Sequence, residues 1–565
     1  MGKMSSVNKE LQKFSIEMRL ISGSDFPVTL RPFSEMIASC VGPKGKVKLI
    51  QSEGGIEILT TSSKRLLQWI EIDCPVLQVI SNSMKGQWEM YNDFGLLTGL
   101  ISSYLLIDAS NYLVPFTKMS KLVKVMSSVS SSLLQSSNIE IKVDFSSLKQ
   151  LLQIVRAIIT SKPLCGKSTL IDVEALCFSI VKGFLHGFSQ ESSCLGSVSV
   201  LVEEGPSSEP PTTFPGVLYA LPANGGEEEY HWRVPSNCAK KKLLVVLFTD
   251  NLSTSCQHCN YTDVVLAEGC IEIQNQVILE RIEVICQKLL AAGVSVFACQ
   301  KVIHPVTQLF LRRNGALVLE RMGKELADSF AVLSDAVPIA DINIEAVPED
   351  WIGEIEAIEH ITKGHKSYLL LKQENHLKDV ATILAFVPGE QMVAELKVSI
   401  HQSLQSLCHL VSHPFVYPGS GCLEVWLAEE LQSSILKEMD EICKEYQCNK
   451  FEVLSVLFWF RSTFLRVSNH ITRFSGPITI MDSVYHHCWS KVESNSCNCG
   501  LVNKNSLEDI GTEWSFIEID VIKEKIDIMC SLKKLEEMKC NGSSFISKKT
   551  LEANISNEKQ IKKND

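Results

Sequence analysis

Two short glycine-containing runs, far apart in the sequence, have the composition of loops that bind the phosphates of a nucleotide. The first is Gly-Pro-Lys-Gly at residues 42–45, and the second is Gly-Ser-Gly at residues 419–421. Glycine lets backbone N–H groups approach phosphate oxygens, and lysine adds a positive charge. A third run, Asn-Asp-Phe-Gly-Leu-Leu-Thr at residues 92–98, combines an acid with a glycine. The three runs predict a nucleotide site assembled from distant parts of the chain.

The order and spacing of these runs resemble those of the group II chaperonins, whose subunits carry G-P-K-G, then G-D-G-T-T-S, a catalytic aspartate and a Gly-rich loop. Longer strings resemble the divergent McKusick–Kaufman/Bardet–Biedl branch of this family. These strings are V-D-F-S-S at 143–147, T-S-K-P at 160–163, C-Q-K-V-I-H-P at 299–305, and C-N-C-G at 497–500 followed by W-S-F at 514–516. The resemblance extends from about residue 33 to residue 516.

Compared residue by residue, the resemblance implies that the chemistry of this site is lost. Phe94 stands where the family has a Mg²⁺-binding aspartate, and Leu96 and Leu97 stand where it has threonines. Leucine donates no hydrogen bond, and each desolvated phosphate oxygen left without a donor would cost about 1–3 kcal/mol. Gln402 occupies the position of the catalytic aspartate in the run V-S-I-H-Q-S-L, and glutamine has no anionic form that could act as a base.

The family's T-N-D-G loop corresponds in this interpretation to Glu53-Gly54-Gly55, with Gly54 in place of its acid. The resemblance therefore implies no catalytic residue, no metal site and no required cofactor, with at most weak binding of ATP or ADP. Glycines also persist wherever a turn needs a positive φ, whatever the ligand. The residues expected to form the residual nucleotide loops are Gly42, Pro43, Lys44, Gly45, Asp93, Gly95, Gly419 and Gly421, with Glu424 nearby.

Composition restricts the class of protein further. A chain of 565 residues with a formal net charge of −11 predicts several domains and gives no basic surface for nucleic acid. The first residues contain no apolar stretch typical of a secretory signal, so the 20 cysteines are interpreted as reduced thiols of a cytoplasmic protein. No run of about 18 apolar residues predicts insertion into a membrane.

Patterns along the chain predict a central α/β unit between mainly helical flanks. Apolar runs at 243–248, 294–299 and 316–319 are typical of buried strands, and the segments between them have helical periodicity. Such alternation favours a parallel sheet. Helical periods also cover residues 66–84, with a break expected at Pro75, and 96–106, 148–159, 396–410 and 423–446. The breaker-rich segment 203–213 is interpreted as a connection between domains.

This arrangement corresponds to the multi-domain α+β plan of a group II chaperonin. The plan has a discontinuous, mainly α-helical equatorial domain, a small intermediate domain and a central α/β apical domain. We predict an equatorial domain at 1–147 and 412–530, an intermediate domain at 148–213 and 376–411, an apical domain at 214–375, and a polar, disordered tail at 531–565.

Three other groups of residues have alternative explanations. Cys165 to Thr169 is similar to the end of a Walker A motif, but its first glycine is replaced by Ser161. Cys256 and Cys259, and the histidines and cysteines between 486 and 499, lack a second pair at zinc-finger spacing. We interpret the first group as a chance match and the others as free side chains.

The resemblance implies a chaperonin-like assembly factor that binds clients without productive ATP hydrolysis. It also implies partners: other divergent chaperonin-like proteins of the Bardet–Biedl group, subunits of the cytosolic chaperonin TRiC, and BBSome components as clients, at the centrosome or basal body of the cilium. Clients are expected at helical segments 275–290 and 304–313 of the apical domain. Two alternatives stay open: an ATP-dependent folding subunit that uses Asp93 after a loop shift, and a monomeric apical-type binding module.

Overall fold

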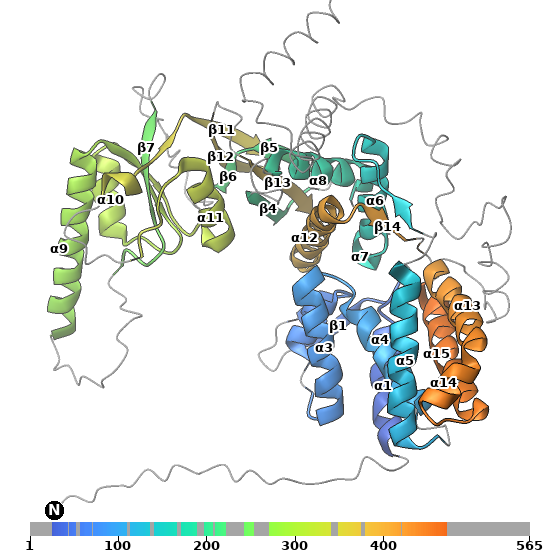
Figure 1. Ribbon diagram of the computed structural model, residues 1–565. Helices are drawn as coiled ribbons and strands as arrows, with labels where there is room; N and C mark the ends of the chain where they lie inside the picture. Colours follow the sequence, from blue (N-terminus) through green and yellow to red (C-terminus); the bar gives the residue numbers. More distant parts are fainter. Residues whose placement is uncertain are drawn as a thin grey trace, which may run out of the picture.

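The structure of this chain is a computed structural model that describes most of the sequence between residues 25 and 471. The described residues are 25–42, 45–51, 57–70, 72–109, 114–135, 140–166, 171–188, 197–206, 209–221, 242–253, 270–340, 348–373, 379–417, 419 and 421–471. Figure 1 shows three regions within them, which we name the helical, middle and distal regions; the middle region stands between the other two. The predicted tail at 531–565 lies outside the described residues.

The helical region joins elements from both ends of the described chain. Its elements are α1 (Asp25–Ala38), β1 (Lys48–Gln51), β2 (Glu57–Thr60), α2 (Ser63–Trp69), α3 (Pro75–Tyr91), α4 (Gly95–Ala109), α5 (Phe116–Gln135), α13 (Cys422–Lys437), α14 (Met439–Glu445) and α15 (Lys450–Ile471). Helix α15 contacts α4, α5 and α13, and so links two apolar clusters. Burial of these faces, more than helix propensity, holds the early and late helices together.

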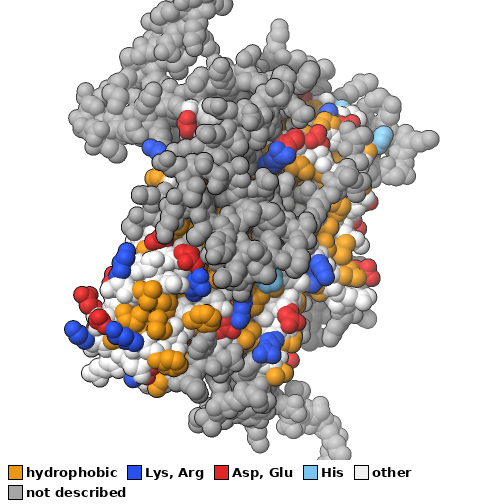
Figure 2. Space-filling model, turned by 90° about the vertical axis from the view of Figure 1, so that its right-hand side faces the viewer, with side chains coloured by type: hydrophobic (Ala, Val, Ile, Leu, Met, Phe, Trp, Pro, Cys, Tyr) orange, Lys and Arg blue, Asp and Glu red, His pale blue; other side chains and the backbone are white. Residues whose placement is uncertain are grey.

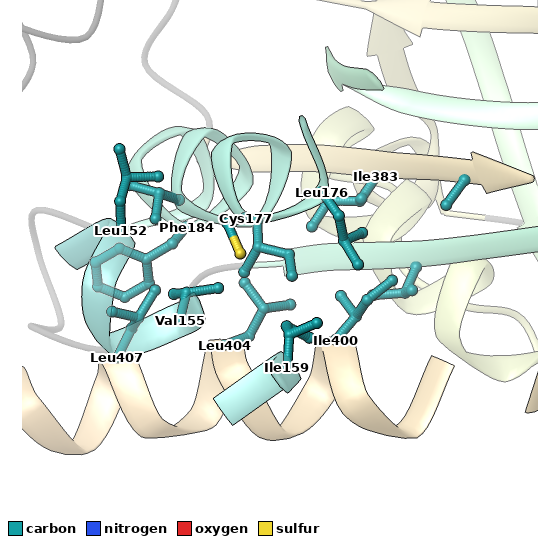
Figure 3. Packing of buried hydrophobic residues seen from close by; sticks show 14 of the residues in the cluster. Leu152, Val155, Ile159, Leu176, Cys177, Phe184, Ile383, Ile400, Leu404 and Leu407 are labelled. Carbon is teal, nitrogen blue, oxygen red and sulfur yellow. The ribbon is translucent and has the colours of Figure 1, made fainter. Parts of the chain in front are cut away.

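The middle region is built around a three-stranded sheet in the order β4–β13–β5. Its elements are α6 (Leu148–Thr160), α7 (Pro163–Gly166), α8 (Val173–Gly187), β4 (Ser197–Glu204), β5 (Thr212–Pro215), β13 (Val380–Val387) and α12 (Glu390–Ser412). All eight residues of β13 are buried. Figure 3 shows Leu152, Phe184 and Leu404, which come from α6, α8 and α12, packed together in one apolar cluster.

The distal region contains the predicted α/β unit. Its elements are β6 (Val217–Ala220), β7 (Leu243–Phe248), α9 (Cys270–Ala291), β8 (Val294–Cys299), α10 (Pro305–Arg313), β9 (Leu317–Leu319), α11 (Gly323–Ser334), the 3-10 helix η2 (Glu349–Trp351), β10 (Gly353–Ile355), β11 (Ala357–Lys363) and β12 (Lys366–Lys372). Strands β7, β8 and β9 are parallel, which confirms the predicted sheet. Strand β10 extends it antiparallel to β7, and β11–β12–β6 form a second sheet.

Several predicted breaks agree with the structure, and two segments differ. Helix α2 ends at Trp69 and Pro75 begins α3, where the missing N–H of proline loses no helical hydrogen bond. The expected helix at 423–446 is divided at Glu438, which closes α13 and precedes α14. The predicted connection at 203–213 is wrong: its two ends belong to β4 and β5, which both pair with β13. Ladder hydrogen bonds to a buried strand outweigh the local preference of the polar residues there.

The chain passes between the helical and middle regions at a small two-stranded ribbon. Strand β3 (Ile141–Lys142) pairs antiparallel with β14 (Phe415–Val416). The outgoing and returning segments are therefore held side by side. The ribbon lies where the chain leaves the helical region toward α6 and where it returns after α12.

Candidate functional site

The two glycine runs that the sequence connects to a nucleotide converge on one helix end. Gly42 and Gly421 have φ values of 78° and 85° and both face the C-terminal end of α15. A Cβ on Gly42 would lie 2.7 Å from the carbonyl oxygen of His470, and one on Gly421 would lie 2.9 Å from that of Ser468. Backbone packing against α15 thus requires glycine at both positions, with or without a ligand.

Of the other described residues in these two runs, Gly45 is also closely packed, whereas Gly419 is not. A Cβ on Gly45 would lie 2.5 Å from the carbonyl oxygen of Cys40, and the Gly45 N–H donates to the Gly42 carbonyl. A Cβ on Gly419 would have no atom of the described residues within 4 Å. Pro43 and Lys44 lie outside the described residues, as do Glu53, Gly54 and Gly55. The structure therefore places the glycines of the two runs and leaves the role of the lysine a prediction.

The third predicted run forms the tight turn between α3 and α4. Asn92 and Phe94 have φ values of 56° and 63°, a left-handed conformation that is costly for phenylalanine. Gly95 begins α4 and is buried, and a Cβ there would lie 2.9 Å from the Cβ of Ser63. Leu96 and Leu97 pack against the apolar cluster of the helical region. The hydroxyl of Thr98 donates to the carbonyl of Phe94, within the turn itself.

Asp93 is engaged within the protein. Its carboxylate accepts a hydrogen bond from the Phe94 N–H at 2.8 Å and pairs with the Lys162 ammonium at 3.3 Å. Lys162 lies between α6 and α7, so this ion pair joins the helical and middle regions. The positive charge of Lys162 beside Asp93 disfavours binding of a second cation to the same carboxylate.

Gln402 is buried on α12, with 2% of its surface exposed. Neither its amide nitrogen nor its amide oxygen has a hydrogen-bond partner among the described residues. It shares a helix face with Glu395 and Ser399, whose hydroxyl lies 3.6 Å from the Cys165 thiol. An amide in this position offers no base for activating water.

The structure also shows a buried polar cluster around Glu395 that the sequence did not predict. The Glu395 carboxylate, 1% exposed, accepts hydrogen bonds from the Thr60 hydroxyl at 2.9 Å and from the Thr61 N–H and hydroxyl at 2.9 and 2.8 Å. The Arg65 guanidinium lies 3.3 Å away. We name these residues the inner lock. Four consecutive hydroxyl residues, 60–63, between a strand and a helix were the signal that could have indicated it.

Burial shifts the pKa of titratable groups around the converging loops and of the Cys165 thiol, which lies beside Ser399 of α12. Desolvation raises the pKa of Glu424 in the first turn of α13 and lowers that of His470, whose ring nitrogen lies 2.8 Å from the Tyr104 hydroxyl. Burial also raises the pKa of the Cys165 thiol to about 11 and that of Cys422 to about 12. These thiols stay protonated at neutral pH and are poor nucleophiles and metal ligands.

The remaining groups of interest give no site within the described ranges. No cluster of three potential metal ligands is found among the residues that the structure describes. Cys165 and Gly166 belong to the short helix α7, and the rest of the Walker-like run, both cysteine groups and the tail lie outside those residues. No helix in the described part of the chain has the length and hydropathy needed to cross a bilayer.

Comparison with known proteins finds a chaperonin family model and chaperonin-like relatives. The family model described as "TCP-1/cpn60 chaperonin family" matches residues 33–451. The chain is 28% identical over 508 residues to "Molecular chaperone MKKS" of Mus musculus, and 26% identical over 507 residues to the protein of that name from Homo sapiens. Each alignment covers 86% of this chain and 86% of the relative. It is also 22% identical over 412 residues to the thermosome subunit alpha of Sulfurisphaera tokodaii, with 71% of each chain covered.

Proposed function

Because this chain belongs to the TCP-1/cpn60 chaperonin family, we propose that it is a chaperonin-like scaffold that binds client proteins without productive ATP hydrolysis. The observation that carries the proposal is the buried amide of Gln402 on α12. The position that the family resemblance assigns to the catalytic acid holds a group that cannot take a proton from water.

The phosphate loop supports the same proposal. Leu96 and Leu97 pack into the apolar cluster of the helical region, so they offer nothing to phosphate oxygens. Asp93 is paired with Lys162, which argues against the alternative in which Asp93 holds a catalytic Mg²⁺. No cofactor is needed in this proposal, and binding of ATP or ADP is weak at most.

Client binding is assigned to the distal region, where α9 and α10 carry exposed apolar side chains. Val277 and Val284 are spaced seven residues apart on α9 and are 41% and 48% exposed, and Val306 and Leu309 on α10 are 59% and 51% exposed. Residues seven apart lie on one face of a helix. An apolar face of this kind suits unfinished proteins that expose hydrophobic segments.

A second apolar surface lies at the helical region. Phe451, Leu454 and Phe458 follow one face of α15 and are 70%, 42% and 61% exposed. Figure 2 shows hydrophobic side chains gathered in the lower half of the face that it presents, with charged side chains around them.

The partners in this proposal come from the family resemblance. We assign to this chain the assembly of the BBSome for ciliary trafficking, together with other divergent chaperonin-like proteins of the Bardet–Biedl group and TRiC subunits. The site of action is then the cytoplasm and the centrosome or basal body of the cilium. The relatives named "Molecular chaperone MKKS" support the chaperone part of this assignment.

The first test is phosphate release from Mg-ATP by the purified full chain, with Asp93→Ala and Gln402→Asp beside it. We expect no turnover in the natural protein or in Asp93→Ala, and none in Gln402→Asp, because Leu96 and Leu97 still replace the phosphate-binding hydroxyls. Turnover that is lost in Asp93→Ala would contradict the proposal and favour an ATP-dependent folding subunit.

The second test measures suppression of aggregation of an unfolded client protein. Val306→Asp with Leu309→Asp on α10 should reduce the suppression, because charge on an apolar contact face opposes its desolvation. The matched control is Val332→Asp on α11, which changes a valine that is 48% exposed in the same region. An equal loss in the control would argue against the α9–α10 surface.

A further inference from the structure

The exposed face of α10 carries positive charge beside its apolar side chains. Val306, Leu309 and Arg313 are spaced three and four residues apart, so they lie on one face of the helix. Val306 and Leu309 are 59% and 51% exposed, and Arg313 is exposed as well. Thr307 and Leu311 are buried on the opposite side. The surface that α10 offers to a partner is therefore both apolar and basic.

Helix α9, which lies beside α10 (Figure 1), repeats this combination. Val277, Arg281, Val284 and Lys288 are spaced four, three and four residues apart, which places them in one stripe along the helix. All four side chains are exposed. The stripe alternates between an apolar and a basic residue, so each exposed valine has a cation one turn away.

The carboxylates near these two helices have hydrogen-bond donors within the protein. Helix α10 itself contains two arginines and no acidic residue. On α9, Glu280 and Glu283 lie outside the stripe, and each accepts a hydrogen bond from a glutamine one turn away, at 3.2 and 3.4 Å. Near the start of α10, the Glu320 carboxylate accepts hydrogen bonds from the Gln308 amide at 2.9 Å and from the Ile303 N–H at 3.2 Å. The exposed face of α10 is therefore left with a positive charge.

An arginine at the C-terminal end of a helix also has a structural use, because it interacts favourably with the helix dipole. Arg313 closes α10 and can serve in this way. Arg281 lies in the middle of α9, where the dipole has little effect. Stabilisation of a helix end also gives no reason for exposed valines and a leucine beside the cations. The shared pattern of the two helices points instead to recognition of a partner.

We propose that the clients of the α9–α10 surface are protein segments that carry carboxylates beside their apolar side chains. The apolar groups of the client pack on the exposed valines and Leu309, and its carboxylates accept charge-assisted hydrogen bonds from Arg313 and Arg281. A segment with the same apolar residues but with lysines in place of the acids is repelled. This inference rests on the proposed scaffold function and names the chemical class of its clients.

The negative charge of the whole chain does not prevent this preference. The formal net charge is −11, but at physiological ionic strength an exposed charge is screened beyond about 8 Å. A client segment lying on α9 and α10 therefore responds mainly to the cations of these two helices. The preference for acidic segments should weaken as salt is added, whereas the apolar part of the contact should persist.

The experiment measures binding of three synthetic amphipathic peptides to the full chain by fluorescence anisotropy. The peptides carry a neutral dye and share one leucine stripe, and they differ only in having glutamate, glutamine or lysine beside it. The glutamate peptide should bind about three- to tenfold more tightly than the glutamine peptide, since a few exposed ion pairs contribute modestly each. The lysine peptide should bind most weakly. These differences should shrink at about 0.5 M salt, where the Debye length is only a few ångströms.

Variants of the chain separate the two parts of the contact. Arg313→Gln combined with Arg281→Gln should bring the affinity for the glutamate peptide down to that for the glutamine peptide, and leave the latter unchanged. Leu309→Ala should weaken the binding of all three peptides. Lys324→Gln is the matched control, because it removes an exposed cation from α11 of the same region and should change none of the affinities. If the double variant does not fold, as judged by circular dichroism, Arg313→Gln alone should give part of the same effect.

Two kinds of failure can be told apart. Equal affinities for the glutamate and lysine peptides, with binding still weakened by Leu309→Ala, would overturn the preference for acidic clients and leave the scaffold function standing. If none of the three peptides binds, the assignment of clients to the α9–α10 surface fails as well. A folded double variant that binds all three peptides more weakly would show that the arginines only support the structure, and this would also overturn the proposal.

Discussion

Two glutamates hold α12 against its neighbours, and they differ mainly in burial. Glu395 is 1% exposed and receives four donors from Thr60, Thr61 and Arg65. Glu325 is 38% exposed and receives Lys397, His401 and one backbone N–H. The number of partners is similar, but water can replace the partners of Glu325 and cannot reach those of Glu395. Two glutamate contacts on opposite sides of α12 therefore differ in their access to solvent: the one at Glu395 excludes water, and the one at Glu325 is partly open to it.

Glu395→Ala should give the largest effect, because it tests the buried side of this comparison. The change leaves the Thr60 and Thr61 hydroxyls and the Arg65 charge without their acceptor in a buried place. The free energy of unfolding should fall by about 3–5 kcal/mol. Urea unfolding followed by fluorescence would measure it. Glu390→Ala, at an exposed position in the first turn of the same helix, should cost about 1 kcal/mol or less.

Phe94→Gly tests the turn between α3 and α4, next to the Asp93–Lys162 pair that joins the helical and middle regions. Phe94 has a φ of 63° and is 56% exposed, so glycine relieves strain and gives up little burial. Thermal unfolding should show a gain of about 1 kcal/mol. Asn92→Gly is the control, since asparagine adopts positive φ more readily and its replacement should change stability less. A loss of stability in Phe94→Gly would show that the aromatic ring makes a needed contact.

Glu325→Gln should lower the free energy of unfolding by about 1 kcal/mol or less, because the side chains of Glu325 and Lys397 are more than a third exposed and solvent screens their charges. The difference from the natural protein should shrink as salt is added. Urea unfolding at low and high salt would measure both effects, beside Asp328→Asn, which removes one exposed carboxylate from the same helix. A cost equal to that of Glu395→Ala would contradict the distinction between the two contacts.

Acid should lower the stability of the folded protein in two steps, one at His401 and one at Glu325. Burial outweighs the attraction of Glu325 and lowers the pKa of His401 below 6.5, so the folded state resists protonation and stability falls as pH drops below about 6.5. Burial alone would raise the pKa of Glu325, but donation by Lys397 and the Val200 N–H outweighs it and lowers that pKa below 4.5. The Glu325 contribution is therefore present above pH 4.5 and lost as pH falls through the folded value.

Unfolding midpoints between pH 7.5 and pH 3.5 would measure these steps. His401→Gln should remove the first step and keep the second, whereas Glu325→Gln should remove the second. A stability curve of the natural protein that stays flat from pH 7 to pH 5 would contradict the first step. We expect this to be the smallest of the four effects, because His401 is partly open to water.

Much of the secondary structure follows from local patterns. The strands at 243–248 and 294–299 were predicted with their observed bounds, since continuous apolar runs bounded by polar residues mark buried strands. Strands β4 and β5 were missed because their ends are polar and rich in breakers. Their pairing with β13 is a long-range contact that no local pattern contains.

Parts of the candidate site also followed from residue types. The replacement of an acid by Gln402 and of hydroxyls by Leu96 and Leu97 is visible in the sequence alone. The burial of Gln402, and the ion pair that engages Asp93, were not visible, because they depend on how α12 and the α6–α7 turn meet the helical region.

The sequence by itself determined the family, the periodic helices, the parallel strands of the distal region and the chemical types at the nucleotide loops. Each of these depends on residue identity and on spacing along one segment. The tertiary structure alone decided that Gly42 and Gly421 meet at α15, that Glu395 finds its donors 334 and 335 residues away, and that Glu325 reaches α12. Burial and hydrogen-bond partners are set by which distant segments pack together, and packing is a property of the whole fold.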